Sequence, residues 1–136
     1  MEESAKNTIL VVDDDKMCIT FLCGILNPHY TLYVAMDGKS AIEVAYNNMP
    51  DLILSDIDMP EMNGIELIKA LHLSDATKKI PFIFFTGRDT AEDKEKGFRL
   101  GAVDYIPKNI LPDVLRQRIQ KQIEAINIAR GLNDGV

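Results

Sequence analysis

Five short apolar segments alternate with five segments of helical periodicity, and this alternation constrains the fold more than any other feature of the chain. The apolar segments are Thr8–Val12, Thr31–Ala35, Leu52–Ser55, Pro81–Phe85 and Val103–Ile106. Between them, apolar residues recur every three or four positions, as on the buried side of an amphipathic helix. Strands that are apolar on both faces and separated by helices predict an α/β fold, with a parallel sheet covered on both sides and right-handed crossovers.

Local start and stop signals bound the predicted helices. Asp37 and Asn63 precede the second and third helical segments and carry side chains suited to N-capping. Asp15 precedes the first, where the helix macrodipole favours an acid. The fourth helix is predicted over Ala91–Leu100, with Gly101 in the position after its end. The fifth is predicted to begin near residue 111 and to end at about residue 130.

The composition indicates a single globular domain. The chain has 136 residues, of which 46% are hydrophobic and 26% are charged. Its net charge of −6 argues against direct binding of nucleic acid. No apolar run approaches the roughly 18 residues of a membrane span, and the polar start lacks a secretory signal. We therefore expect a cytoplasmic protein without a membrane partner.

The domain limits follow from the outermost predicted elements. We expect one domain over residues 8–130. Residues 1–7 are predicted to form a poorly ordered N-terminus, and residues 131–136 a frayed C-terminus or the start of a linker. The two cysteines, Cys18 and Cys23, have no metal-binding spacing, so we expect them to be small buried or half-buried residues.

Polar side chains follow four of the predicted strands. Asp13 and Asp14 follow the first strand, and Asp56 follows the third. Thr86 follows the fourth and Lys108 the fifth. Because parallel strands end at the same edge of a sheet, where open α/β sheets bind ligands, we expect these side chains to meet. Three carboxylates, a hydroxyl and an amine suit Mg²⁺ and a phosphoryl group.

These residues belong to motifs that carry a family resemblance. The sequence resembles a response-regulator receiver domain, the phosphoacceptor module of two-component signalling, from about Thr8 to Arg130. The resemblance implies a flavodoxin-like (βα)5 fold, with a doubly wound parallel five-stranded sheet in the order 2-1-3-4-5. The matching motifs are Val11-Val12-Asp13-Asp14, Asp56 with Met59-Pro60 and Met62-Asn63-Gly64, Thr86-Gly87, Gly101-Ala102 and Tyr105-Ile106-Pro107-Lys108.

The resemblance implies a phosphoacceptor site. Asp56 is expected to be the nucleophile that accepts a phosphoryl group from a phosphohistidine donor in a Mg²⁺-dependent reaction. A carboxylate and a phosphoryl group repel each other, so the reaction needs a cation to screen them. Asp14, Asp56 and the backbone carbonyl of Asp58 are expected to bind Mg²⁺, or Mn²⁺ in its place. Asp13 is expected to act through water.

The resemblance also implies phosphoryl contacts and a switch. Lys108, Thr86 and Gly87 are expected to contact the phosphoryl oxygens, Lys108 as a mobile point charge. Thr86 is then expected to move toward the phosphoryl group while Tyr105 turns inward. This would alter the surface of the fourth helix, fifth strand and fifth helix, and so control partner binding or homodimerisation. Alternatively, Tyr105 is an ordinary half-buried strand tyrosine, Thr86 a β-branched strand end and Lys108 a surface lysine.

Two further residues are expected at the rim of the pocket. Asp58 and Arg88 lie two residues beyond Asp56 and Thr86. An exposed pair of this kind contributes about 0–1 kcal/mol to stability. We therefore expect its effect to be on kinetics, through control of the water that attacks the aspartyl phosphate.

The sequence departs from the family pattern at the residue after Lys108. Many family members follow this lysine with a proline in a cis peptide, whereas Lys108 is followed by Asn109. A cis bond that does not precede proline costs about 2.5–4 kcal/mol. We expect a trans bond here, with a strained cis bond as the alternative.

Several partners and alternatives remain open from the sequence. The expected donor is a histidine kinase or histidine phosphotransfer protein, docked over the first helix, where Met17 is an exposed apolar candidate. The downstream target is unknown. Ile123, Ile126 and Ile128 in the fifth helix are expected to pack in the core, or else to begin a linker helix or dimer seam. We expect no turnover enzyme, only self-catalysed phosphorylation and slow dephosphorylation.

Two other functions use the same residues. In a Mg²⁺-dependent phosphohydrolase of the haloacid-dehalogenase type, Asp56 and Asp58 would be the nucleophile and acid. The early Asp13-Asp14 pair and the lack of an insertion long enough for a substrate cap argue against it. A pseudo-receiver that only binds partners is the other alternative, and the full set of acids argues against that.

Overall fold

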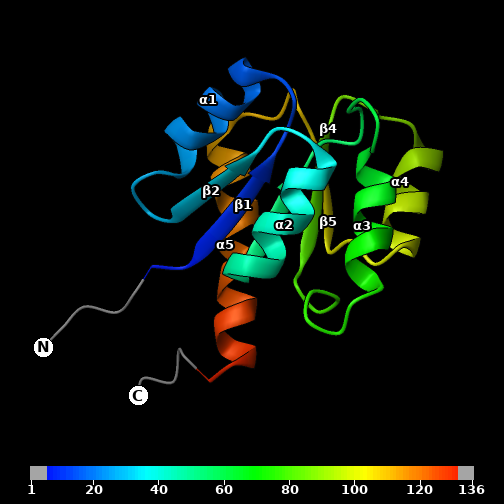
Figure 1. The fold of residues 1–136 in the computed structure, drawn as a ribbon. Coiled ribbons are helices and arrows are strands. Elements are labelled where there is room, and N and C mark those ends of the chain that lie inside the picture. The colour runs from blue at the N-terminus through cyan, green and yellow to red at the C-terminus, as the bar shows by residue number, and fades with distance from the viewer. Residues whose placement is uncertain (1–5, 132–136) are drawn as a thin grey trace, which may run out of the picture.

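Strands and helices alternate without exception in the computed structural model, which describes residues 6–131 (Figure 1). The strands are β1 (Thr8–Val12), β2 (Thr31–Ala35), β3 (Leu52–Ser55), β4 (Phe82–Thr86) and β5 (Asp104–Pro107). The helices are α1 (Lys16–Leu26), α2 (Gly38–Asn48), α3 (Gly64–His72), α4 (Ala91–Arg99) and α5 (Pro112–Ala129). The predicted alternation is confirmed. β4 and β5 each lie one residue later than predicted, because Thr86 and Pro107 still pair with each other.

The five strands form one parallel sheet in the order β2-β1-β3-β4-β5, as the family resemblance implies. The register places Ser55 at the end of β3 between Val12 of β1 and Phe84 of β4. All strands therefore end at the same edge. The loops that follow β1, β3, β4 and β5 lie next to one another there.

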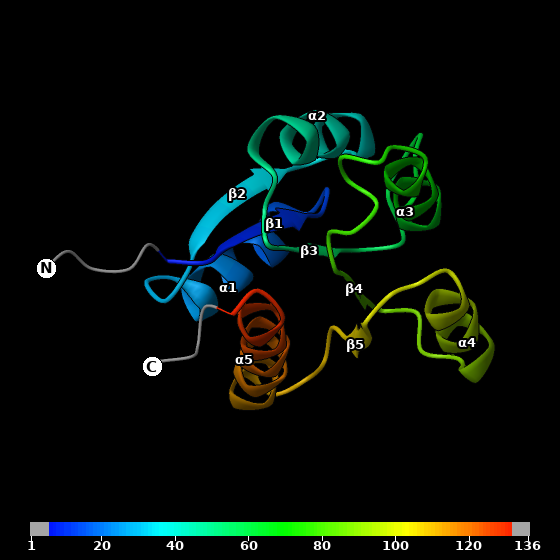
Figure 2. The same ribbon diagram turned by 90° about the horizontal axis from the view of Figure 1, so that it is seen from below.

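Helices cover both faces of the sheet, with α1 and α5 on one face and α2, α3 and α4 on the other (Figure 2). Alternate residues of β1 show the division. Ile9 and Val11 belong to the apolar cluster that contains buried residues of α1 and α5. Leu10 and Val12 belong to the cluster that contains buried residues of α2 and α3. Burial on both sides explains why the strand segments are continuously apolar.

Side-chain caps start most of the helices. Asp15, Asp37 and Asn63 each accept a hydrogen bond from a backbone N–H in the first turn of α1, α2 and α3, which confirms the caps predicted at Asp37 and Asn63. Thr90 caps α4 in the same way, and this cap is not among those predicted. α5 begins with Pro112, whose missing N–H costs nothing in the first turn.

Polar contacts join the amino edge of the sheet to the end of α5. The side-chain amides of Asn7 and Asn127 exchange hydrogen bonds of 2.9 and 3.2 Å. Asp51, just before β3, accepts hydrogen bonds from the Thr8 backbone N–H at 2.8 Å and from Arg130.

Residues 1–5 and 132–136 lie outside the described part of the chain, so the predicted domain limits stay predictions.

α5 is the longest helix and contributes to the core. Ile123 and Ile126 are buried, whereas Ile128 is 65% exposed. Ile123 and Ile126 therefore pack in the core, whereas Ile128 and Ala129 lie on the surface.

Within residues 6–131, no helix combines the length and the apolar character that crossing a membrane requires.

Candidate functional site

Three carboxylates come together at the carboxyl edge of the sheet. The Asp56 backbone N–H donates to the Val12 carbonyl at 3.0 Å, which holds the end of β3 against the end of β1. One carboxylate oxygen each from Asp13, Asp14 and Asp56 lies within 4.8 Å of the other two. Asp13 and Asp56 are buried, at 1% and 6% exposed, while Asp14 is exposed. The result is a concentration of negative charge that solvent can reach on one side.

Lys108 is the cation of this cluster. Its Nζ lies 2.8 Å from Oδ2 of Asp13 and 2.9 Å from Oδ2 of Asp56. Burial alone would lower the pKa of Lys108, but the contacts with the two carboxylates outweigh burial and raise this pKa above its usual value. The Lys108 backbone N–H donates to the Thr86 carbonyl at 3.0 Å, which holds the loop after β5 beside the end of β4.

The cluster retains capacity for a further cation. Oδ1 of Asp13 accepts the Asp15 backbone N–H at 3.0 Å. Oδ2 of Asp13 is buried and has no aligned hydrogen-bond donor among residues 6–131, although the Lys108 nitrogen lies close to it. The Lys108 ammonium contacts two of the three clustered carboxylates, which leaves negative charge uncompensated. Oxygen-only ligands with an unsatisfied buried oxygen fit Mg²⁺, which prefers six oxygen ligands and retains waters.

The turn after β3 orients Asp56. Its Oδ1 accepts the Ile57 backbone N–H at 2.7 Å and, at a longer 3.4 Å, that of Asp58. The Gly64 N–H, at the start of α3, closes the turn by donating to the Ile57 carbonyl at 2.9 Å. A Cβ on Gly64 would lie 2.2 Å from the Asp56 carbonyl oxygen, so only glycine fits. Gly64 belongs to the sequence motif Met62-Asn63-Gly64, but the motif alone does not indicate this steric role.

Thr86 and Gly87 lie at the end of β4, next to the acids. Thr86 is fully buried, and its Oγ1 accepts the Arg88 backbone N–H at 3.2 Å. Gly87 is exposed, and a Cβ added there would meet no atom within 4 Å. The space over Gly87 is therefore open.

The predicted rim pair of Asp58 and Arg88 is present. Nε and Nη2 of Arg88 donate to Oδ1 of Asp58 at 2.9 and 2.7 Å. This hydrogen-bonded contact raises the pKa of Arg88. Both side chains are about half exposed, and the pair joins the loops that follow β3 and β4. The contact is as expected, and its kinetic role stays a prediction.

Tyr105 is buried rather than half-buried, at 3% exposed. Its ring packs against Phe84 with a centroid separation of 5.9 Å, and its hydroxyl donates to the Arg88 carbonyl at 2.9 Å. Burial raises the pKa of Tyr105 to about 12, with a further contribution from the charge of Asp93. The ring thus already occupies the inward position that we expected phosphorylation to favour.

The peptide bond between Lys108 and Asn109 is trans. The one cis bond within residues 6–131 is Asn27–Pro28, so the Lys108–Asn109 bond is trans, as expected. Ile110 N–H donates to the Pro107 carbonyl at 3.1 Å, which closes a turn around Lys108. A trans bond in this turn therefore suffices to bring the lysine to the acids.

A cavity of about 250 Å³ borders the acid cluster on the α1 side. Met17, which is 81% exposed as predicted, lines it together with Cys18 and Lys108. Burial, followed by the neighbouring Asp13 carboxylate, raises the pKa of Cys18 to about 12. The thiol therefore stays protonated beside the site. The place of Cys18 in the first turn of α1, directly after the acids, is the sequence signal that indicates a residue beside the site.

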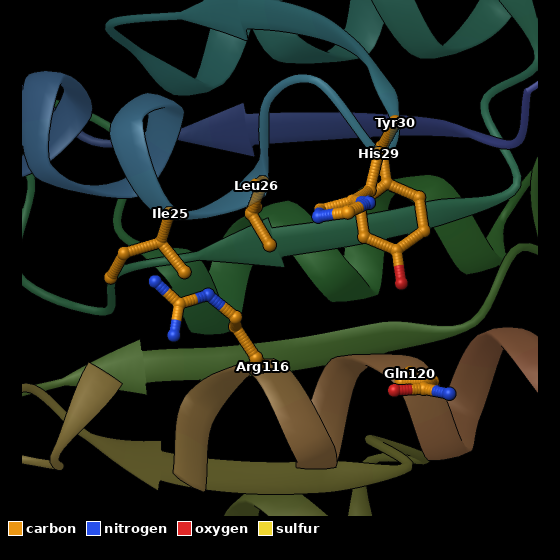
Figure 3. A pocket seen from close by; sticks show the side chains of 6 residues that line it. All are labelled: Ile25, Leu26, His29, Tyr30, Arg116 and Gln120. Carbon is orange, nitrogen blue, oxygen red and sulfur yellow. The ribbon is translucent and has the colours of Figure 1, made fainter. Parts of the chain in front are cut away.

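A second cavity, of about 370 Å³, lies between α5 and the loop that joins α1 to β2 (Figure 3). The rings of His29 and Tyr30 and the side chains of Arg116 and Gln120 are among those that line it. His29 and Tyr30 contact each other edge to face, with centroids 6.5 Å apart. None of the three clustered acids lines this cavity, so it is separate from the site.

The fold and the acid cluster define a class of protein, and the comparisons with known proteins agree. Residues 9–120 match the response regulator receiver domain, so the chain belongs to this family. It is a receiver domain of the two-component type, a phosphoacceptor switch. Receiver domains serve as signalling modules rather than turnover enzymes, and they interact with histidine kinase donors and downstream effectors.

Particular relatives are longer than this chain. A Vibrio cholerae protein named "Probable cyclic di-GMP phosphodiesterase" is 40% identical over 124 residues, which cover 91% of this chain and 28% of that protein. The Bacillus subtilis alkaline phosphatase synthesis transcriptional regulatory protein PhoP is 34% identical over 122 residues, covering 89% and 50%. The chain thus spans half or less of both proteins, and the activity in each name describes that protein.

Solved structures share the fold across nearly their whole length. The chemotaxis protein CheY4 of Vibrio cholerae has a TM-score of 0.80 and 30% sequence identity, covering 86% of this chain and 98% of that chain. A CheY-like receiver domain protein of Methanospirillum hungatei has a TM-score of 0.84 and 26% identity, covering 92% and 99%.

Proposed function

We propose that Asp56 accepts a phosphoryl group from a phosphohistidine donor in a Mg²⁺-dependent reaction, and that the chain changes its partner-binding surface in response. The observation that carries this proposal is the position of Asp56. Its carboxylate follows the end of β3, within 4.8 Å of oxygens of Asp13 and Asp14 and 2.9 Å from Nζ of Lys108. A nucleophile, a cation site and a phosphoryl-binding amine thereby share one edge of the sheet.

The reaction would be a displacement at phosphorus. The Asp56 carboxylate forms the new O–P bond while the N–P bond to the donor imidazole breaks, and the electron pair of that bond stays on the imidazole nitrogen. The hydrogen bond from Ile57 N–H to Oδ1 holds the carboxylate in one orientation before the reaction. Lys108 can pass its ammonium from the carboxylate to a phosphoryl oxygen, since its stem is flexible and it is a compact charge.

Asp13, Asp14 and Asp56 would hold Mg²⁺, or Mn²⁺, with the backbone carbonyl of Asp58 as a further ligand. Once bound, the ion would screen the repulsion between Asp56 and the incoming phosphoryl group. The buried Oδ2 of Asp13, which has no aligned donor, supports this assignment. In this proposal Asp13 acts on the ion through a bound water molecule, while Asp14 and Asp56 bind it directly.

Thr86 and Tyr105 would couple the pocket to the surface of α4, β5 and α5. The backbone of Arg88 links them, because its N–H donates to Thr86 Oγ1 and its carbonyl accepts from the Tyr105 hydroxyl. If the Thr86 hydroxyl turns to a phosphoryl oxygen, the first of these bonds is lost and the Arg88 backbone can move. Gly87 leaves room for this change and offers a backbone donor.

Two surfaces, the start of α1 and the surface of α4, β5 and α5, would bind different partners. A histidine kinase or histidine phosphotransfer protein would dock over the start of α1, where Met17 and Phe21 are exposed at 81% and 40%. A downstream target, or a second copy of the chain, would bind the surface of α4, β5 and α5. The chain itself would catalyse only its own phosphorylation and slow dephosphorylation.

Intact-mass measurement after incubation with acetyl phosphate and Mg²⁺ tests the proposal. We expect one phosphoryl adduct on the parent chain, and none in Asp56→Ala or when the metal is chelated. Asp75→Ala, at an exposed position in the loop before β4, is the control and should behave as the parent. An adduct in Asp56→Ala would place the site elsewhere.

Consumption of the phosphodonor separates the alternatives. No adduct with no consumption would indicate a pseudo-receiver that only binds partners. Rapid consumption of many different phosphoesters would indicate a phosphohydrolase. A transient adduct at Asp56 with slow consumption of acetyl phosphate is the result that we expect.

A further inference from the structure

α4 rests on the sheet through a glycine. Most of its side chains are charged or exposed, and Gly97 is the one buried residue of Ala91–Arg99. The neighbouring Phe98 is 48% exposed and so does not anchor the helix in the core. Figure 2 shows α4 at the β4–β5 end of the sheet, far from α2. Few buried side chains therefore fix the position of this helix.

The absence of a side chain at Gly97 has a steric reason. A Cβ there would lie 3.0 Å from Cδ2 of Tyr105 and 3.1 Å from Cδ2 of Phe84, closer than such contacts normally are. The backbone of Gly97 is helical, so its conformation does not require glycine. Glycine is also a poorer helix former than alanine. The close approach of α4 to the two rings is what the glycine allows.

Tyr105 touches the α4 segment at two separate points. Its ring lies against Gly97 near the end of the helix, and its hydroxyl donates to the Arg88 carbonyl in the loop before the helix. The Arg88 N–H in turn donates to Thr86 Oγ1 in the candidate site. Consecutive contacts thus lead from Thr86, through Arg88 and Tyr105, to Gly97.

We infer that Gly97 is the positioning residue through which α4 follows Tyr105. The inward ring and the docked helix fit together because position 97 carries no side chain. A shift of the ring displaces the helix, since no other residue of Ala91–Arg99 is buried, and Leu100, just after its end, is only partly buried against the core. The steric coupling stands on the contacts alone, and its use in signalling rests on the function proposed above.

A pair of matched glycine substitutions tests the steric coupling. Gly24 lies exposed in α1, and a Cβ there would meet no atom within 4 Å, so Gly24→Ala is the control for Gly97→Ala. Alanine favours the helix at both positions. We expect amide hydrogen exchange of α1 to slow in Gly24→Ala, and that of α4 to accelerate by about five- to tenfold in Gly97→Ala. Slower exchange of α4 in Gly97→Ala would overturn the inference.

Removing the ring should reverse the effect. In a Tyr105→Ala background, a Cβ at position 97 no longer meets the Tyr105 ring, and its remaining 3.1 Å approach to Phe84 can relax into the space that the ring leaves. We therefore expect Gly97→Ala to slow α4 exchange there rather than to accelerate it. Such a change of sign in a double-mutant cycle reports direct coupling between the two positions. An equal acceleration in both backgrounds would show that Gly97 acts through Phe84 or another neighbour, against the inference.

The signalling part is tested with acetyl phosphate and Mg²⁺. We expect phosphorylation to change α4 exchange in the parent chain. We expect Gly97→Ala to form the same adduct and to lose most of that change. An equal α4 response in Gly97→Ala would contradict the inference. If the parent chain forms no adduct, the proposed function fails, while the coupling between positions 97 and 105 is still decided by the double-mutant cycle.

Discussion

The side-chain nitrogen of Lys108 lies 2.9 Å from Oδ2 of Asp56, a residue 52 positions earlier in the chain. The same nitrogen lies 2.8 Å from Oδ2 of Asp13. One ammonium thus compensates two buried carboxylates that would otherwise repel each other. Any divalent cation that binds the cluster has to share these oxygens with Lys108 or displace it.

Lys108→Met should therefore strengthen binding of Mg²⁺ while it weakens the metal-free protein. Loss of a competing positive charge close to the ion should tighten Mg²⁺ binding about tenfold by titration calorimetry. Breaking a buried ion pair costs several kcal/mol, and because Lys108 is 29% exposed we expect a loss of about 2 kcal/mol in urea unfolding without metal. Lys79→Met, at an exposed lysine, is the control. Unchanged Mg²⁺ affinity would show that Lys108 and the ion do not share the site.

Gly64→Ala should damage the site through the backbone. The added Cβ would lie 2.2 Å from the Asp56 carbonyl oxygen and 2.9 Å from Cα of Ile57, and neither atom can move without moving the acceptor turn. We expect the free energy of unfolding, measured with urea, to fall by about 2–4 kcal/mol. We also expect a smaller fraction of the chains to carry the phosphoryl adduct in an intact-mass measurement. Gly87→Ala meets open space and should retain stability. Equal stability of the two variants would contradict this steric account.

The Asp58–Arg88 pair should affect the lifetime of the adduct more than the stability of the fold. Both side chains are about half exposed, so Asp58→Ala and Arg88→Ala should each change unfolding free energy by about 1 kcal/mol or less. We expect both variants to alter the dephosphorylation rate, measured as loss of adduct mass after removal of the phosphodonor. The idea fails if neither substitution changes that rate.

Asp51 should make stability depend on pH. Burial tends to raise its pKa, but hydrogen bonds from Arg130 and the Thr8 backbone outweigh burial and hold this pKa below the usual value. A carboxylate with a lowered folded-state pKa stabilises the protein above its unfolded pKa of about 3.9, and this stabilisation is lost as pH falls through the folded-state pKa. We expect Asp51→Asn to cost about 1–2 kcal/mol at neutral pH.

The measurement for Asp51 is urea unfolding at a series of pH values. The difference between the parent and Asp51→Asn should be constant at neutral pH and should shrink as pH falls below about 4. Asp75→Asn, at an exposed carboxylate, is the control and should show a small difference throughout. A difference that stays constant into the acid range would show that the charge of Asp51 is not what stabilises the fold.

Local patterns predicted the elements well because their causes are local. The apolar runs, the caps at Asp15, Asp37 and Asn63, and the periodicity of the helices all depend on residues within a few positions of each other. The start of α4 at Ala91 is predicted correctly, but the cap at Thr90 is not, although threonine is among the residues that favour the N-cap position. The order of the strands came from the family resemblance, since periodicity does not say which strands are neighbours.

The sequence by itself determined which polar residues end the strands, and so which side chains could meet at one edge. The tertiary structure decided how closely they meet: Lys108 against Asp13 and Asp56, Arg88 against Asp58, and Tyr105 against the Arg88 carbonyl. The tertiary structure also explains why glycine occupies positions 64 and 97. At each of them another segment lies so close that a Cβ would be too near to its atoms. Such distances depend on the packing of whole helices against the sheet, which residue spacing along a chain does not encode.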